Sequence, residues 1–309
     1  MRKYHLVIGD NELVLDYSSD NPNGPQILFD IQQFTASETV NAEIILMNIS
    51  HYYFTMNVPL LGKKISLSAG MEDSPILRKI GYSGKYGLIA QGFISRVIPD
   101  WNGVDTAISV TFQPFPIKTD GNNILYPGYE LSVPICDDIR PYYKKIYKQI
   151  SSNSNNLNMG PDKIKCITAY TQQIYTVAGM SSLLSAQHNL TLGQTGNGFI
   201  LSNVIGLPIN LVPGDFLVQP SLVEYQKIAI TLQLRSDIKM NDIVVLPKEI
   251  FVGITNLDKG LFTTGIDFQG KSIFNLFHGN YRVIGVWQRG DVNNPEAQAW
   301  STTIQGVLA

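Results

Sequence analysis

The stretch from Asn41 to Pro114 decides the fold, because four apolar runs follow one another there with turn residues between them. The runs read AEIILMNIS (42–50), LGKKISLSAGM (61–71), LIAQGFISRV (88–97) and DTAISVTF (105–112). In the last run, apolar and polar residues alternate, which is the period of two that a strand with one buried face requires. Gly62, Gly70 and Asn102-Gly103 mark the chain reversals. The stretch is predicted to form a small antiparallel barrel or sandwich.

The residues before this stretch predict further strands of the same unit. Runs at 4–8 and 12–17 flank the Gly9-Asp10-Asn11 turn and predict a hairpin, and 26–31 predicts the next strand. We therefore expect residues 1–116 to form a first β-barrel domain of the kind that builds tubes.

Residues 117–206 change in character and predict a small α+β insert. Asp138 is expected to cap a helix from 139 to about 150. A strand is expected at 163–168, and a second helix from a Thr171 cap to Gln187, with Ile174, Val177, Ala178 and Leu184 facing inward. Runs at 190–192 and 199–201 predict a hairpin.

From residue 207 the β pattern returns. Ile228, Ile230, Leu232 and Leu234 alternate with Ala229, Thr231, Gln233 and Arg235, and strands are also predicted at 242–246, 281–288 and 299–308. This order and spacing repeat those of the opening stretch. The predicted fold class is therefore mainly β (α+β overall): two similar antiparallel β-barrel domains, 1–116 and 207–309, with the insert 117–206 between them.

Composition excludes several classes of protein. The 309 residues include 16% charged residues, below the roughly 25% that is typical of soluble domains, which favours a surface covered by other protein. A net charge of −2 argues against a dedicated nucleic-acid binder. Cys136 and Cys166 make neither a disulfide framework nor a zinc site, and we expect two buried thiols. No secretory signal and no run of ~20 apolar residues is found.

Candidate catalytic groups are weak, so no catalytic, cofactor-binding or metal site is predicted. The histidines are scattered, and His188 is explained as a cation near a helix C-terminus. No G-x-S-x-G motif supports a serine triad. Asp137-Asp138 are adjacent at a helix start, where capping explains them better than glycoside hydrolysis does. The glycine-rich run 193–198 lacks the Lys-Ser/Thr of a phosphate loop and is interpreted as a hairpin turn.

One charged feature rises above background, a basic stripe on the first helix of the insert formed by Arg140, Lys144, Lys145 and Lys148. It is a candidate contact with passing DNA, with an acidic tail segment or with a neighbouring subunit. The alternative interpretation is a solvated helix face. The sequence leaves both open.

Two groups of residues resemble a known family. Asn48-Ile49-Ser50 with the segment from Gly62 to Gly70 stands where baseplate hub proteins of contractile-tailed phages have an Asn-led turn and a glycine-bounded strand. Tyr281, Val283, Gly290, Asp291, Trp300 and Thr302 match the pattern that closes the second barrel of that family. The chain thus resembles the late control gene D group, which is related to the base of type VI secretion spikes.

The resemblance implies a non-enzymatic structural protein. It would form a homotrimer whose six barrels adapt a six-fold tail tube to a three-fold spike and line the DNA conduit. The partners implied are the tail tube protein, the central spike, the tape-measure protein and the baseplate wedge proteins, and the location is the virion tail, assembled in the host cytoplasm. No cofactor is implied.

Two other functions stay open. A tail-associated cell-wall hydrolase needs an acid/base pair of carboxylates. A carbohydrate-binding tail module needs an exposed aromatic platform, for which Tyr52, Tyr53 and Trp101 are the candidates.

Overall fold

The computed structural model describes most of the chain. The described residues are 1–10, 12–18, 20–34, 42–49, 60–72, 85–102, 105–116, 118–120, 123–125, 128–151, 156–195, 198–218, 220–224, 226–247 and 279–309. The three candidates for an aromatic platform lie outside this description: Tyr52 and Tyr53 are not among these residues, and neither is the side chain of Trp101.

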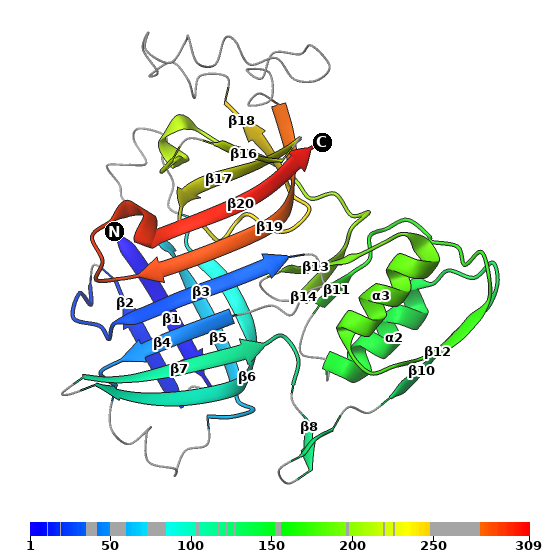
Figure 1. Cartoon of the computed structure of the whole chain (residues 1–309), viewed down its shortest axis with the longest axis horizontal. Coiled ribbons are helices and arrows are strands. Elements are labelled where there is room, and N and C mark those ends of the chain that lie inside the picture. Colours follow the sequence, from blue (N-terminus) through cyan, green and yellow to red (C-terminus); the bar gives the residue numbers. More distant parts are fainter. Residues whose placement is uncertain are drawn as a thin grey trace.

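The N-terminal half is antiparallel, as the alternation predicts. Its strands pair in the order β3-β4-β7-β6-β5-β1-β2 (Figure 1). Their bounds are β1 (Arg2–Ile8), β2 (Leu13–Tyr17), β3 (Ile27–Phe34), β4 (Ala42–Met47), β5 (Lys64–Met71), β6 (Gly87–Asn102) and β7 (Asp105–Gln113). The four apolar runs between Asn41 and Pro114 therefore correspond to β4 to β7.

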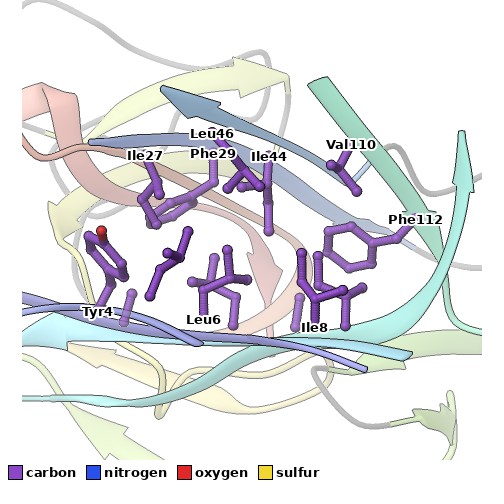
Figure 2. Packing of buried hydrophobic residues seen from close by; sticks show 14 of the residues in the cluster. Tyr4, Leu6, Ile8, Ile27, Phe29, Ile44, Leu46, Val110 and Phe112 are labelled. Atoms are coloured by element: carbon purple, nitrogen blue, oxygen red, sulfur yellow. The ribbon is translucent and has the colours of Figure 1, made fainter. Parts of the chain in front are cut away.

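The core of this half lies between two layers of strands. Tyr4, Leu6 and Ile8 point from β1 toward side chains of β3, β4 and β7, which come from the opposite layer (Figure 2). Strand β6 makes the turn between layers, because residues 87–93 pair with β5 and residues 93–102 pair with β7, with a bulge at Ile94/Arg96. Burial of alternate residues on each strand holds the two layers together.

The C-terminal half adds strands to the same sheet. The strands are β15 (Pro208–Asn210), β16 (Ser221–Glu224), β17 (Lys227–Gln233), β18 (Ile243–Leu246), β19 (Gly279–Asp291) and β20 (Trp300–Leu308), with short helices η2 (Pro213–Asp215) and η4 (Ala297–Ala299). The order is β16-β17-β20-β19; β18 pairs with β19, and β15 pairs with β18. A separate apolar cluster, which includes Ile230, Val244 and Tyr281, fills this half.

Strand β19 joins the two halves into one sheet. On one edge its residues 279–282 pair with β18 and its residues 285–291 pair with β3, with a bulge at Val283/Gly285 in its pairing to β20. Thirteen of the described strands thus belong to a single sheet whose order ends at β2 and β16. The prediction of a mainly β fold is confirmed. The two predicted barrels are not observed, because the described strands form an open sheet that does not close on itself.

The insert contains both α-helices of the described part of the chain and has its own apolar cluster. Figure 1 shows it beside the large sheet. Its elements are β10 (Tyr129–Val133), α2 (Arg140–Ser151), β11 (Asn156–Asn158), β12 (Tyr170–Ile174), α3 (Val177–His188), β13 (Leu192–Thr195) and β14 (Gly198–Leu201), preceded by β8 (Lys118–Asp120) and β9 (Asn123–Leu125). The backbone N–H of Arg140 donates to Asp138 Oδ1 at 3.3 Å, so the predicted cap of α2 is confirmed. The predicted hairpin is β13–β14.

Two predictions in the insert are wrong. Thr171 does not cap a helix: it lies in β12, paired with Ser132 of β10, and Thr176 caps α3 instead by accepting from the Gly179 N–H at 3.1 Å. The β10–β12 pairing spans about 40 residues of sequence, so the local pattern could not reveal it. Ala178, expected to face inward, is exposed.

The predicted strand at 163–168 is also absent from the described structure. Instead, the segment bonds to the turn before α2, with one isolated bridge from Lys165 to Asp138. The Ile139 N–H donates to Ile164 O at 3.0 Å, and the Cys136 N–H donates to Cys166 O at 2.8 Å. The predicted domain limits at residues 116 and 206 stay a prediction.

Candidate functional site

Five strands that pair in succession, β20, β19, β3, β4 and β7, present a continuous outward face. Along each of these strands, buried residues alternate with half-buried or exposed ones, so one set of side chains points away from the core. Because the strands pair in unbroken succession, these outward side chains form one face. We call it the outer sheet face.

A row of polar side chains crosses the outer sheet face. The register aligns Arg289 of β19 with Asp30 of β3, then with Glu43 of β4 and Thr111 of β7. Adjacent strands lie about 4.8 Å apart, so register partners lie side by side on this face. The row therefore places Arg289 beside Asp30 over the junction of the two halves, and Asp30 beside a second carboxylate, that of Glu43.

Asp30 is the centre of the strongest contacts in this row. It accepts a hydrogen bond from Trp287 Nε1 at 2.5 Å and another from Arg289 Nε at 3.3 Å. The guanidinium of Arg289 also lies over the Trp287 ring, with 3.6 Å between Cζ and the ring centroid. All three side chains come from the β3–β19 pair, so the contacts fix the register where the halves meet.

A cavity of about 340 Å³ opens on this face beside the polar row. Leu28, Ile45 and Ala299 supply apolar surface, and the backbone of Gly290 completes the wall. The charged residues that line it are Asp30, Glu43, Arg289 and Asp291. Asp291 Oδ1 accepts from the N–H groups of Asn293 and Asn294, which orders the turn that follows β19.

On the buried side of the same strands, the rings of Phe29 and Trp300 pack against Gly290. Phe29 and Trp300 meet edge to face, with ring centroids 5.4 Å apart and planes at 70°. Gly290 is the register partner of both, and a Cβ there would lie 2.1 Å from Phe29 Cε1. Trp300 Nε1 donates to Gly70 O at 3.2 Å, which ties β20 to β5. Only a glycine fits between these rings.

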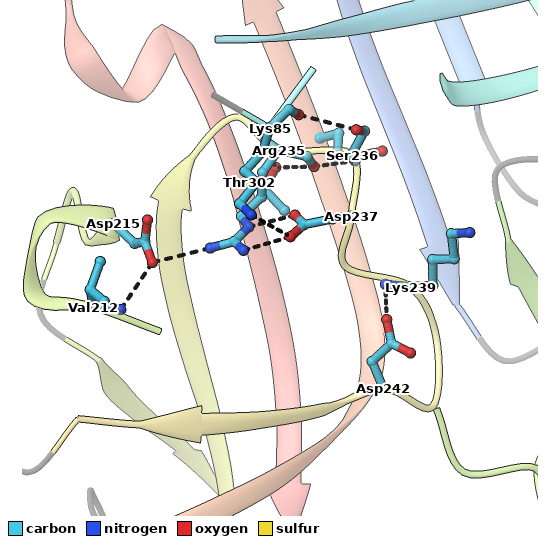
Figure 3. A network of polar contacts seen from close by, with 10 residues as sticks. Lys85, Val212, Asp215, Arg235, Ser236, Asp237, Lys239, Asp242 and Thr302 are labelled. Atoms are coloured by element: carbon cyan, nitrogen blue, oxygen red, sulfur yellow. Dashed lines mark hydrogen bonds and ion pairs between the residues drawn. The ribbon is translucent and has the colours of Figure 1, made fainter. Parts of the chain in front are cut away.

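A buried ionic network supports the same junction (Figure 3). Arg235, 3% exposed, donates through Nε and Nη2 to both oxygens of Asp237 at 2.7 Å and lies 3.2 Å from Asp215 Oδ2. Lys85 Nζ lies 3.7 Å from Asp237 Oδ2. Burial alone would raise the pKa of Asp237, but the hydrogen bonds and charge of Arg235 outweigh it and lower that pKa.

The network also binds backbone from both halves. The Arg235 N–H donates to Thr302 Oγ1 at 3.0 Å, and Ser236 N donates to Lys85 O at 3.0 Å. Sequence reasoning missed this role, because Arg235 falls at a polar position of the alternating run and was expected to point outward. The one available signal was Asp237 two residues later.

The four residues of the basic stripe do not share one environment in the structure. Lys144, Lys145 and Lys148 are exposed on α2. Arg140 is engaged instead in the insert: it pairs with Asp138 at 2.7 Å and donates to Gly160 O at 3.0 Å. Its hydrogen bonds lower the pKa of Asp138. Whether the stripe contacts a partner stays a prediction, and the three lysines are the part of it that is available.

The other candidate groups are placed in structural contacts. Asp137 accepts from Tyr142 Oη at 2.6 Å, and Asp138 from Arg140, so this pair serves the start of α2. His188 does end a helix, as expected, but burial lowers its pKa and favours the neutral ring, which lies 3.0 Å from Tyr170 Oη. The expectation of a helix-terminal cation is therefore not supported.

The two cysteines are not equivalent. Cys166 is buried, whereas Cys136 is exposed, so the expectation of two buried thiols is half wrong. Among the described residues, no group of histidine, cysteine and acidic side chains is arranged to hold a metal ion. Within the same part of the chain, no helix is long and apolar enough to span a membrane.

No protein-family profile and no curated protein sequence matches the chain. Solved structures do match. The 43 kDa tail protein of prophage MuSo2 from Shewanella oneidensis matches with a TM-score of 0.52 at 8% identity, over 100% of this chain and 97% of that one. A tail protein from Neisseria meningitidis matches with a TM-score of 0.53 at 6% identity, over 99% and 96%.

A secretion protein matches equally well. It is an E. coli component of the type VI secretion system that is structurally similar to the T4 bacteriophage tail proteins gp27 and gp5. Its TM-score is 0.52 at 8% identity, over 98% of this chain and 76% of that one. The chain therefore has the fold of these tail and secretion proteins along its whole length, and the resemblance inferred from the sequence is confirmed at the level of the fold.

Proposed function

We propose that this chain is a non-enzymatic structural protein of a phage tail baseplate or of a related contractile injection machine. The observation that carries the proposal is the likeness to two tail proteins and a type VI secretion component over nearly the full chain. At identities of 6–8%, that likeness speaks for the fold, and the function follows by analogy.

The role we assign is that of a homotrimeric hub. Each chain would contribute two β units, so that three copies present six units to a six-fold tail tube at one end and three-fold symmetry to a spike at the other. The pairing of β3 with β19 supports this role, because it joins the two halves edge to edge. In the assembled ring these units would form the tube-like barrels that the resemblance implies.

The outer sheet face is our candidate for the lining of the conduit. Its outward side chains are mostly polar or charged, and oppositely charged residues such as Arg289 and Asp30 neutralise one another. Such a lining leaves DNA free to pass, whereas a strongly basic one would bind the phosphate backbone. The partners proposed are the tail tube protein, the spike, the tape-measure protein and the baseplate wedge proteins, in the virion tail.

The alternatives find less support. For a cell-wall hydrolase, the Asp137 and Asp138 carboxylates would have to act as a pair, yet each is held by a helix-start contact. For a carbohydrate-binding module, the candidate platform falls outside the described residues. A muralytic assay on the purified protein separates the hydrolase from the hub.

The test of the hub is assembly. The purified chain is mixed with the tail tube and spike proteins of the same tail, and the mass and symmetry of the complexes are measured. Three copies per complex, bound to both partners, support the proposal. A chain that stays monomeric with both partners, or that degrades peptidoglycan, contradicts it.

A further inference from the structure

The cavity on the outer sheet face is the feature that the structural role leaves unexplained. Its apolar lining comes from Leu28, Ile45 and Ala299, on β3, β4 and η4. At about 340 Å³ it lies at the small end of the range for ligand sites, which suits one or two side chains and not a folded domain.

The charge of the cavity is unbalanced. Three carboxylates line it, those of Asp30, Glu43 and Asp291, against the single guanidinium of Arg289. That guanidinium is already committed to Asp30 and to the ring of Trp287. The acidic excess therefore lies with Glu43 and Asp291.

Each acidic group is held in place. Glu43 is exposed and accepts a hydrogen bond from the Ser109 hydroxyl of β7, whereas Asp291 is fixed by the backbone of the turn after it. Carboxylates ordered in this way bind a cation without having to be ordered first, which saves conformational entropy on binding. The apolar wall between them suits the hydrocarbon stem of a lysine or an arginine.

Two other occupants fit less well. The described residues offer no metal-binding arrangement of acidic side chains, so an inorganic cation lacks its ligand set. Phosphate groups would meet an excess of carboxylates, so a nucleic acid is repelled.

We propose that this cavity binds a lysine or arginine side chain, flanked by apolar residues, on an extended polypeptide segment of a partner protein. The inference rests on the proposed function for the location of the partner, because the same face is assigned there to the conduit. The cavity would then recognise a basic protein segment that passes along or is seated in that conduit.

The experiment measures binding of fluorescent twelve-residue peptides to the full chain by polarisation at low salt. One probe carries Leu-Lys-Leu-Lys in a Gly-Ser background, and its counterpart carries Leu-Glu-Leu-Glu. Single-stranded DNA of the same length is the third probe. The basic peptide is expected to bind and the other two are not. The result that overturns the proposal is equal binding of the two peptides, or binding of the DNA alone.

The variant Glu43→Gln locates the site. It keeps the acceptor for Ser109 and removes one charge, so basic-peptide affinity should fall by up to about fivefold, the range of a partly exposed ion pair. The matched control is Glu130→Gln, an exposed strand glutamate of the insert, which should leave affinity unchanged. If Glu43→Gln and Glu130→Gln lower the affinity for the basic peptide equally, the cavity is not the binding site.

A second variant tests the apolar wall. Ile45→Thr keeps the β-branched shape but places a hydroxyl in the wall, and it should weaken the basic peptide further while the melting curve confirms a folded chain. If the affinity of Ile45→Thr for the basic peptide is unchanged, the apolar wall does not contact the bound peptide. A trimer that fails to bind the peptide refutes this inference alone, whereas a monomer that binds it refutes only the proposed function.

Discussion

The junction between the two halves can be tested at Gly290, where a single methyl group has no room. A Cβ at this position would lie 2.1 Å and 2.2 Å from two ring carbons of Phe29, and 2.8 Å from Trp300 Cζ3. Real Cβ contacts are never this short, so Gly290→Ala must push the rings apart or open the β3–β19 pairing.

The loss of stability expected for Gly290→Ala depends on how far the two rings can move. Overpacking of a well-filled core typically destabilises by about 1–3 kcal/mol. Here both obstacles are rigid rings, and the strand lies between register partners on either side. We therefore expect Gly290→Ala to lower the free energy of unfolding by about 3 kcal/mol, at the upper end of that range.

The assay is a double-mutant cycle by urea unfolding. Phe29→Leu alone removes ring contacts, and we expect a loss of about 1–2 kcal/mol. In the double variant the methyl group introduced by Gly290→Ala takes part of the space that the ring has left, so the combined loss should be smaller than the sum by about 1–2 kcal/mol.

The control is Gly214→Ala, since a Cβ at Gly214 meets nothing within 4 Å. It should change stability by less than about 1 kcal/mol. Strictly additive losses at Gly290 and Phe29, or a Gly290→Ala variant as stable as the parent, would refute the packing of the junction described here.

Three further outcomes are expected. Arg235→Gln removes the buried guanidinium that lies between Asp215 and the one-third-exposed Asp237, and it should cost about 2–3 kcal/mol in urea unfolding, below the range for a fully buried ion pair. Burial raises the pKa of Asp242 to about 6, above its unfolded value near 4, so ionising it costs stability as pH rises from about 4 to 6. The free energy of unfolding of Asp242→Asn should therefore rise relative to that of the parent between pH 4 and 6, by roughly 1 kcal/mol because Asp242 is partly exposed. The difference should persist above pH 6. Lys144→Glu with Lys148→Glu should leave the melting temperature unchanged, because both side chains are exposed.

Each of these has a control or a contrary result. Lys227→Gln breaks the exposed pair with Glu224 and should cost less than about 1 kcal/mol, so an equal cost at Arg235 would contradict the buried network. A constant difference between Asp242→Asn and the parent from pH 4 to 8 would contradict the raised pKa. For the lysines, unchanged assembly and DNA delivery support a solvated helix face, and loss of either supports a contact.

Sequence patterns predicted the strands because the physics of a strand with one buried face is local. In β7, for example, Ile108 and Val110 are buried while Ser109 is not, as their alternation indicates. The cap of α2 was also predictable, since Asp138 acts within two residues of its partner.

The long-range pairings could not be predicted in this way. Strands β3 and β19 are separated by about 250 residues, and nothing in either strand marks the other as its neighbour. The outer sheet face and its cavity depend on that pairing, so the candidate site was out of reach as well. Arg235 was misplaced for a related reason: its two carboxylate partners, Asp215 and Asp237, come together only in the folded chain.

The native mass of the purified protein, mixed with its tail tube and spike partners, shows whether three copies assemble on this fold. We expect a complex that contains three copies of the 34.3 kDa chain, with six β units facing the tube. A single copy per complex, or six copies with one unit of each facing the tube, would contradict it.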